Sequence, residues 1–271
     1  MNICFIGGGN MAVALIGGLL KRSYTAAQLR VVEINADNCI RLKNDFGVSA
    51  TPELATGVAD SDVIVLAVKP QQLHEVCTQL TPLLQGQLIV SIAAGIRASD
   101  ISSWLGSSNV VRSMPNTPAL IQSGVTGLYA LSEVSVAHKE IAANILNAVG
   151  STVWLQEEVM LDGVTAISGS GPAYVFYFIE SMQQAARELG FDDVQAKSLV
   201  IDTLLGATKL AQASNDEVSV LRARVTSKNG TTERAILSME KDGVKQHIIA
   251  AVHAAAIRSK EMGDELGGKP C

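Results

Sequence analysis

The sequence has few cysteines, and none of them is spaced as a metal-binding or redox motif. The four are Cys4, Cys39, Cys77 and Cys271, with no Cys-x-x-Cys unit among them. Cys4 lies inside the first apolar run of the chain. This usage indicates reduced, mostly structural thiols, and we expect a cytoplasmic protein.

Motifs of zinc enzymes and serine hydrolases are also absent. The histidines include no pair four residues apart, no His-Glu-x-x-His and no Cys/His cluster; they are His74, His138, His247 and His253. We therefore predict no metal site. The segment Ser168-Gly-Ser-Gly171 does not fit the Gly-x-Ser-x-Gly elbow of a nucleophilic serine.

Long apolar runs and dense basic stretches are missing as well. No stretch reaches the roughly eighteen unbroken apolar residues of a membrane helix. The net charge of −5 argues against a nucleic-acid surface. The apolar N-terminus lacks the basic start of a signal peptide, because its first cations are Lys21 and Arg22, so we expect Met1 to begin the mature chain.

The most informative feature that is present is the N-terminal segment. Ile3 to Ile6 predict a buried strand, Gly7 to Gly9 a turn, and the residues from Asn10 a helix. Gly7, Gly9 and Ala12 fill the three small-residue positions of G-x-G-x-x-G/A. The first allows a tight turn, the second leaves room for a pyrophosphate, and the third lets the helix lie close to the sheet. The helix N-terminus offers free N–H groups to phosphates.

An acidic residue follows at the spacing that this motif requires. Glu33 ends the apolar run from Leu29, about twenty residues past the turn, where a carboxylate can bind a ribose hydroxyl. The strand, turn, helix and acid together favour a dinucleotide-binding unit. A βαβ unit without phosphate binding is the alternative.

Up to about residue 155, β-branched runs alternate with helical patterns. Predicted strands are Asn2–Ile6, Leu29–Glu33, Val63–Val68, Gln87–Ile92, Asn109–Ser113, Thr126–Ala130 and Thr152–Leu155. Predicted helices lie around 10–22, 36–46, 71–80, 98–105 and 133–148. This alternation predicts a parallel sheet covered on both faces, with ligands at the carboxyl ends of its strands.

After about residue 158 the pattern becomes helical throughout. Predicted helices are 157–167, 172–189, 193–213, 217–225, 231–241 and 243–263. Residues 173–179 and 248–257 are apolar around the helix and must be buried. We expect them to pack in an intimate homodimer; a core helix within one subunit is the alternative. The predicted fold is an α/β Rossmann-type domain over 1–158 and an all-α dimerisation domain over 159–271.

Two loops at predicted strand ends carry polar side chains. Lys69, in Ala67-Val-Lys-Pro-Gln71, is a cation at the sheet edge where a cofactor lies. Asn116 and Thr117 follow the strand that ends at Ser113, between two prolines that stiffen the loop. Each loop is either a ligand contact or an ordinary turn.

Two further loops carry glycine and hydroxyl groups. Ile167 to Tyr174 place two glycines, two serines and a proline at an expected helix start, which would expose N–H groups. Val225 to Ala235 form a polar turn that leads into another helix and resembles a small-anion nest. A hinge and a plain helix-to-helix loop are the respective alternatives.

Taken together, these motifs resemble pyrroline-5-carboxylate reductase, which reduces a cyclic imine to proline. The resemblance covers nearly the whole chain and rests on six segments in order: Gly7–Met11, Ala67–Pro70, Ser91–Gly95, Met114–Ala119, Ser168–Tyr174 and Ser227–Thr232. The family implies the two-domain fold above, with dimers that interlock through the helical domains and in some members assemble further.

The resemblance implies the site residues and the reaction. NADP, or NAD as the alternative, would contact Ile6, Gly7, Gly8, Gly9, Asn10, Met11, Glu33, Asn35, Ala67, Val68, Lys69, Pro70 and Asn116. The substrate carboxylate would bind Ser227, Lys228, Asn229, Gly230 and Thr231, and Thr232 would bond the imine nitrogen. Hydride transfer to the imine carbon would complete proline biosynthesis, mostly through positioning.

The chain departs from the family pattern in one loop. A second question is which cofactor Glu33 favours. The family usually has Ser-Pro-Gly-Gly where this chain has Ser227-Lys-Asn-Gly230. Asn229 tolerates left-handed backbone, and we hypothesise that Lys228 attracts the substrate carboxylate. Glu33 favours the ribose diol of NADH and repels a 2′-phosphate, although many members of the family favour NADPH and Asn35 could bind the phosphate.

Two other classes compete with this interpretation. One is a β-hydroxyacid dehydrogenase or imine reductase of similar build. The dehydrogenases carry a catalytic lysine shortly after the interdomain glycines, and Pro172 to Tyr177 contain none. The other is a non-catalytic dinucleotide sensor, which would need no second polar loop facing the nicotinamide. An assay of NAD(P)H oxidation with pyrroline-5-carboxylate separates the three.

Overall fold

The computed structural model describes residues 1–267 and divides them into two compact units. The sheet unit contains Met1–Pro172 and the chain from Ala254 onward, and the helical unit contains Ala173–His253. The domain boundary after residue 158 stays a prediction. Cys271 and the end of the C-terminal tail lie outside the described residues.

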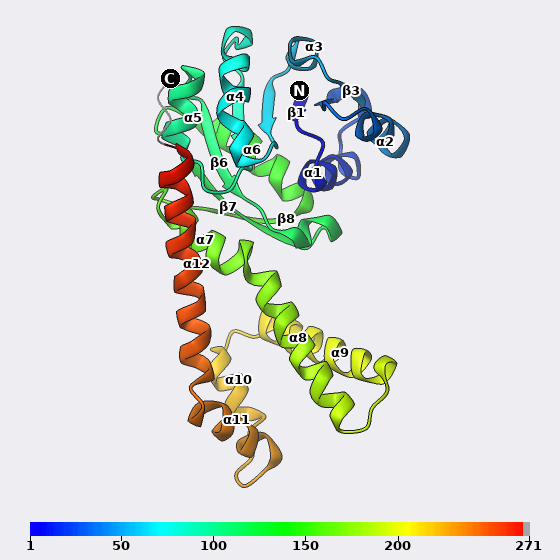
Figure 1. Ribbon diagram of the computed structural model, residues 1–271, viewed down its shortest axis with the longest axis vertical. Helices are drawn as coiled ribbons and strands as arrows, with labels where there is room; N and C mark the ends of the chain where they lie inside the picture. Colours follow the sequence, from blue (N-terminus) through cyan, green and yellow to red (C-terminus); the bar gives the residue numbers. More distant parts are fainter. Residues whose placement is uncertain (268–271) are drawn as a thin grey trace. The chain divides into compact units, whose positions relative to one another are not determined.

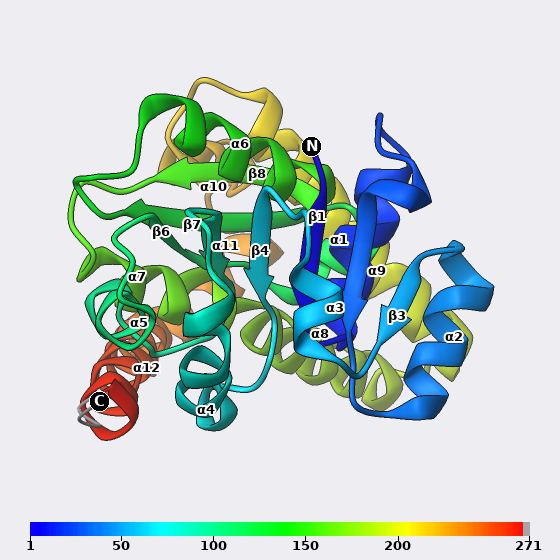
Figure 2. The ribbon, with the colours of Figure 1, turned by 90° about the horizontal axis from the view of Figure 1, so that it is seen from above.

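The sheet unit is built on eight strands in the order β3-β2-β1-β4-β5-β6-β7-β8 within the described residues (Figures 1 and 2). Their bounds are β1 Ile3–Ile6, β2 Leu29–Val32, β3 Ser49–Thr51, β4 Val63–Leu66, β5 Leu88–Ser91, β6 Val110–Met114, β7 Gly124–Ala130 and β8 Gly150–Trp154. The central strand β1 pairs in parallel with β2 and β4, so the glycine turn that follows it opens at the carboxyl edge of the sheet.

Helices cover both faces of this sheet. The main ones are α1 Asn10–Leu20, α2 Ala36–Phe46, α3 Leu54–Val58, α4 Pro70–Leu80, α5 Ala98–Leu105, α6 Val136–Leu146 and α7 Met160–Val164. Ile3 and Phe5 of β1 pack in the core cluster under α1, α2 and α6, while Cys4 and Ile6 pack under α3, α4 and α5. Because successive strand residues point to opposite faces, a strand buried on both sides is apolar without alternation.

The predicted parallel sheet contains one antiparallel pair of strands. β6 and β7 run antiparallel, with Val111 opposite Ala130, and β8 then pairs in parallel with β7. The link from Met114 to Gly124 holds only the short 3₁₀ helix η3 (Thr117–Ile121). A link of this length cannot make the crossover that a parallel pair needs.

The helical unit contains α8 Gly171–Glu188, α9 Asp193–Ala213, α10 Val218–Arg224, α11 Thr231–Lys241 and the first part of α12 Val244–Gly267. These bounds lie close to the predicted helices. None of the described residues of α8 is buried, and Phe176 and Tyr177 are 65% and 74% exposed. The helical unit of a single chain therefore exposes large apolar side chains to solvent.

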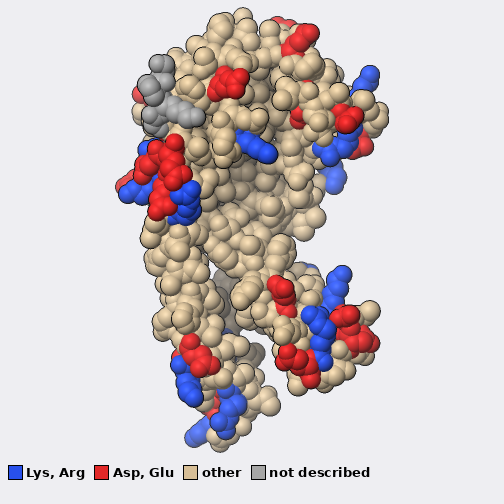
Figure 3. Space-filling view, viewed as in Figure 1, with Lys and Arg blue, Asp and Glu red and all other residues tan. Residues whose placement is uncertain are grey.

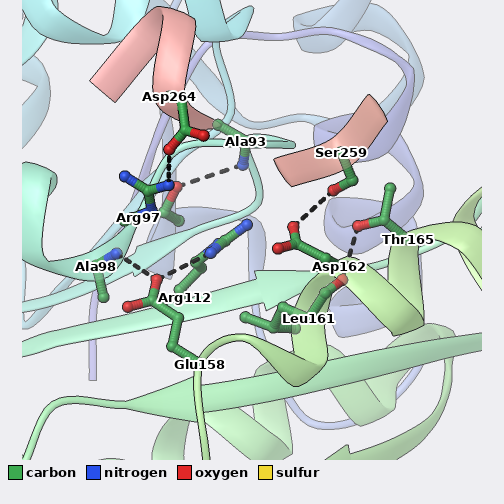
Figure 4. Close-up of polar contacts among 11 residues, drawn as sticks. Ala93, Arg97, Ala98, Arg112, Glu158, Leu161, Asp162, Thr165, Ser259 and Asp264 are labelled. Carbon is green, nitrogen blue, oxygen red and sulfur yellow. Dashed lines mark hydrogen bonds and ion pairs between the residues drawn. The ribbon is translucent and has the colours of Figure 1, made fainter. Parts of the chain in front are cut away.

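The C-terminal part of α12 packs into the sheet unit (Figure 4). The buried Ser259 hydroxyl donates to Asp162 Oδ1 at 2.7 Å, and Arg97 pairs with Asp264. Nearby, Glu158 Oε1 accepts from the Ala98 N–H at 2.6 Å and from Arg112 at 2.9 Å. The last helix is thus tied to α7 by a part-buried hydrogen bond and to Arg97 by an exposed ion pair, while Glu158 joins the start of α5 to β6.

Candidate functional site

The turn after β1 depends on glycine at its first position. Gly7 has a φ of +103°, which side-chain-bearing residues rarely adopt. Its N–H donates to Val32 O at 2.8 Å, and a Cβ here would lie 2.7 Å from Ala67 O. Gly7 is therefore required by the backbone that joins β1, β2 and the end of β4.

Gly9 is glycine for a different reason. It precedes α1 with φ −71° and ψ −179°, a conformation open to any residue, and a Cβ would meet nothing within 4 Å. No side-chain cap hydrogen bond closes the α1 N-terminus at this residue, which leaves the N–H groups of the first turn available to a ligand. The fold does not need this glycine, whereas a phosphate that approaches the helix N-terminus does.

Glu33 is fixed beside this turn. Its Oε2 accepts from the Gly8 N–H at 3.0 Å, and its Oε1 accepts from the Asn35 N–H at 2.8 Å. The side chain of Asn35 is itself occupied in capping α2, where it accepts from Asn38 N at 3.0 Å. The carboxylate of Glu33 is thus held in place by two backbone donors at the end of β2.

These residues line one cavity of about 500 Å³ in the sheet unit. Of the predicted cofactor contacts it is lined by Ile6, Gly7, Gly8, Gly9, Glu33, Asn35, Ala67, Val68 and Lys69. Asn10, Met11 and Pro70 are absent from this lining; Asn10 follows the lining residue Gly9 and Pro70 follows Lys69, whereas Met11 has no lining residue next to it in the chain. Lys69 is the one cation in the lining, is exposed, and has no ion-pair partner within residues 1–267.

The cavity also has walls that the sequence analysis missed. Pro52 follows β3 and Leu54 begins α3, and both elements are too short to give a clear pattern. Gln72, Glu75, Val76 and Gln79 come from one face of α4. Their spacing of three and four residues, directly after the Lys69-Pro70 turn, is the signal that could have identified this wall.

Asn116 uses its side-chain amide within the protein. Its Nδ2 donates to Ser168 O at 3.1 Å, and its Oδ1 accepts from the Val125 N–H at 2.9 Å. The residue is 8% exposed and does not line the cavity of the glycine turn. It joins the loop after β6 to β7 and to residue 168, and its contact with a cofactor stays a prediction.

In the Ser168–Tyr174 segment α8 starts at Gly171, one residue before the predicted helix, but the residues that precede it are helical as well. Residues Thr165–Gly169 form a π-helical turn between α7 and α8, and Ser170 N donates to Thr165 O at 2.8 Å. The segment continues one helix into the next, so the expected set of free N–H groups is not present there. Gly169 is packed closely, since a Cβ would lie 2.5 Å from Met114 Cε.

The predicted substrate loop lies in the helical unit and ends at α11. Asn229 adopts φ +61°, as expected for this position, and Gly230 N closes a turn onto Ser227 O at 3.0 Å. Thr231 and Thr232 are the first two residues of the helix, and Thr232 is half-buried. Asn229, Gly230 and Thr231 line an open groove of about 730 Å³.

The fold and the glycine turn define a dinucleotide-dependent oxidoreductase, and the comparisons with known proteins agree. Residues 2–95 match the family described as NADP oxidoreductase coenzyme F420-dependent. Residues 158–262 match the family described as Pyrroline-5-carboxylate reductase dimerisation.

Relatives along the whole chain narrow this class to one family. A pyrroline-5-carboxylate reductase of Pseudomonas aeruginosa is 46% identical over 267 residues, 98% of each chain. The structure of a pyrroline-5-carboxylate reductase from Coxiella burnetii has a TM-score of 0.91 at 39% identity, over 96% of this chain and 98% of that one. That of Plasmodium falciparum pyrroline carboxylate reductase, solved with NADP bound, has a TM-score of 0.88 at 30% identity, over 97% and 98%. The chain belongs to the pyrroline-5-carboxylate reductase family.

Self-association is supported by the dimerisation match and by the bare apolar helices. Between Lys245 and Arg258, α12 carries no Lys, Arg, Asp or Glu, and α8 carries none before Glu180. The visible face in Figure 3 shows the corresponding uncharged stretch along α12. If α12 were a core helix within one subunit, Ile248 and Ile249 would be buried in the single chain. They are instead 54% and 47% exposed.

Other classes of site find no support in the described chain. Within residues 1–267, no group of three or more His, Cys, Asp or Glu side chains could hold a metal ion. No helix in the same residues is both long and apolar enough to cross a bilayer. Cys4, Cys39 and Cys77 are free thiols, and burial raises the pKa of Cys4 and Cys77 to about 12.

Proposed function

We infer that the chain reduces 1-pyrroline-5-carboxylate to L-proline with a reduced nicotinamide cofactor, the last step of proline biosynthesis. The observation that carries this inference is the 46% identity to a reductase of this name over 98% of both chains. The match spans the glycine turn as well as the Ser227–Thr232 loop, so it covers both halves of the proposed site.

NADP is the proposed cofactor, with NAD as a possible second one. The residues present fit a dinucleotide, because Gly9 leaves open space at the α1 N-terminus and a Cβ there would fill it. The turn from Gly7 to Met11 would hold the pyrophosphate, Glu33 and Asn35 the ribose, and Ala67 to Pro70 with Asn116 the remaining length. When bound, the reduced cofactor supplies the hydride that the imine carbon accepts.

The Ser227–Thr231 loop is the proposed carboxylate site. The N–H groups at the start of α11 suit an anion, and Lys228 adds a cation that is exposed and has no ion-pair partner among the described residues. The Thr232 hydroxyl would bond the imine nitrogen and help deliver its proton. No strongly shifted acid is needed, because the imine is readily protonated in water, and positioning supplies most of the catalysis.

The proposal includes a homodimer that buries the apolar faces of α8 and α12, and further assembly of such dimers. Exposed Phe176, Tyr177 and Ile248 support it, because large apolar side chains gathered on a surface mark an interface. A cytoplasmic location is also part of the proposal, and the free thiols Cys4, Cys39 and Cys77 agree with it.

The test is oxidation of NADPH and NADH by the purified protein with 1-pyrroline-5-carboxylate, compared with β-hydroxyacids in the reverse direction and with an acyclic imine. We expect turnover with the cyclic imine carboxylate and formation of L-proline. Turnover only of a β-hydroxyacid, or cofactor binding without any turnover, would contradict the proposal.

A further inference from the structure

The start of α11 contains three backbone N–H groups with no acceptor. Within residues 1–267 the N–H groups of Thr231, Thr232 and Glu233 donate to nothing, whereas Arg234 N already bonds Gly230 O at 3.2 Å. These groups carry the positive end of the helix dipole. They are the donors that the proposed function offers to the substrate carboxylate.

A carboxylate of the chain itself already lies at this end of the helix. Glu233 Oε2 accepts from the Asn229 N–H at 2.6 Å. A glutamate at the third helical position commonly reaches back to the residue before the helix. Here it reaches one residue further, because the Gly230 N–H is used in the turn onto Ser227. Glu233 and Asn229 line the same open groove as Gly230 and Thr231.

We propose that Glu233 is an internal competitor of the substrate carboxylate, an inference that rests on the proposed function. An incoming carboxylate on the Thr231 and Thr232 N–H groups meets the negative charge of Glu233 on the neighbouring N–H. Two carboxylates on neighbouring N–H groups repel each other, and because the groove is open, salt screens part of this repulsion. Glu233 therefore raises the KM for the substrate. It also weakens the binding of proline, which carries the same carboxylate.

A purely structural role for Glu233 predicts the opposite sign. If its hydrogen bond were needed to shape the loop, removal of the charge would loosen the loop and raise the KM. The loop has other restraints, however: Gly230 N bonds Ser227 O at 3.0 Å, and the Thr226 hydroxyl donates to Arg222 O at 2.7 Å. These contacts do not involve the Glu233 side chain. We therefore expect the loss of its charge to change ligand binding more than the structure of the loop.

The deciding experiment compares Glu233→Gln with Glu240→Gln in the full-length protein. Gln at 233 keeps the side-chain length and an oxygen acceptor but removes the charge. Glu240 lies on the same helix, and its 3.5 Å pair with Arg222 is about half exposed, so its loss costs little. KM and kcat for 1-pyrroline-5-carboxylate and the inhibition constant of L-proline are measured at low and high salt, with melting temperatures as a check of folding.

We expect Glu233→Gln to lower the KM and the proline inhibition constant together, by about three- to tenfold at low salt and less at high salt. The kcat should not rise, because substrate and transition state carry the same carboxylate. Glu240→Gln should match the unmodified protein. An unchanged or higher KM in Glu233→Gln, or an equal fall in both variants, would overturn the inference alone. Absence of any imine reduction by the unmodified protein would overturn the proposed function as well.

Discussion

At the scale of single residues, two glycines of the same turn have separable roles. Gly7 serves the backbone, through its φ of +103° and its approach to Ala67 O, whereas Gly9 has ordinary dihedral angles and no neighbour where a Cβ would stand. The sequence motif assigns the tight turn to the first glycine and room for a pyrophosphate to the second. The geometry shows that the turn needs Gly7, and the open space beside Gly9 supports the proposed role of that residue toward a ligand.

Gly9→Ala should therefore fold normally and lose its cofactor. We expect a melting temperature close to that of the unmodified protein and an affinity for NADPH lower by at least about tenfold, since a methyl group would occupy the proposed pyrophosphate site. Cofactor fluorescence titration and thermal unfolding measure the two effects. Gly163→Ala in α7, where a Cβ also meets nothing within 4 Å, is the matched control and should leave both unchanged. A large fall in melting temperature for Gly9→Ala would contradict this separation.

Glu33 is the residue on which cofactor preference depends. Two backbone N–H groups hold its carboxylate in the lining of the cavity, at the proposed position of the ribose. A fixed negative charge there disfavours a 2′-phosphate. We expect Glu33→Ser to raise the ratio of kcat/KM for NADPH to that for NADH by about tenfold, the size of one moderately screened charge repulsion. Glu75→Gln, which neutralises the other carboxylate of the lining, should change the ratio less; an unchanged ratio in Glu33→Ser would show that the phosphate lies elsewhere.

At the scale of elements, the sequence predicted most strands and helices but not all directions and not all cavity walls. β1, β4 and β5 are buried on both faces, so their apolar runs are unmistakable. The short β3 and α3 have no such run, and the direction of β7 depends on the length of its connection rather than on its own residues. The glycine turn could be found because its motif is local, whereas the α4 wall depends on how the helix packs against the sheet.

The start of α5 holds a carboxylate whose burial makes stability depend on pH. Burial raises the pKa of Asp100, an effect that Arg97 partly offsets, and among the described residues Asp100 Oδ2 is buried without a hydrogen-bond partner. The folded protein therefore keeps this proton to a higher pH than the unfolded chain does. The protonated, uncharged Asp100 side chain stabilises the folded state relative to its ionised form. This stabilisation is fully present below the unfolded pKa of about 3.9 and is lost as the pH rises through the raised folded pKa.

The substitution Asp100→Asn removes the loss of stability that ionisation of Asp100 causes as the pH rises. We expect its melting temperature to exceed that of the unmodified protein by about 1–2 °C at neutral pH and to match it near pH 3.5, if both remain folded there; the size is that of a partly screened charge. Thermal unfolding across this pH range measures the difference. Asp37→Asn is the control, because Asp37 also lies in the first turn of a helix, and it should show no gain at neutral pH. A gain of the same size in Asp37→Asn would assign the effect to net charge.

At the scale of the whole molecule, the proposed cofactor cavity and the proposed dimer surface lie in different units. Every lining residue of the 500 Å³ cavity belongs to the sheet unit, whereas bare apolar side chains gather on the helices of the other. Phe176 on α8 is 65% exposed in the single chain and is an expected anchor of the proposed dimer. A charged residue in place of Phe176 should therefore disrupt the proposed dimer without disturbing the proposed cofactor cavity.

Phe176→Asp should yield a monomer that still binds NADPH but no longer reduces 1-pyrroline-5-carboxylate efficiently. A buried, unpaired carboxylate at an interface is strongly unfavourable, so dissociation is expected across the concentrations used in sedimentation velocity. Fluorescence titration with NADPH reports whether the sheet unit stays folded, because its cavity needs no residue of the helical unit. Val136→Asp is the control, since Val136 on α6 is 73% exposed and lies in the sheet unit, and it should change neither mass nor activity. A dimer that persists in Phe176→Asp with full activity would place the interface on another face of the helices.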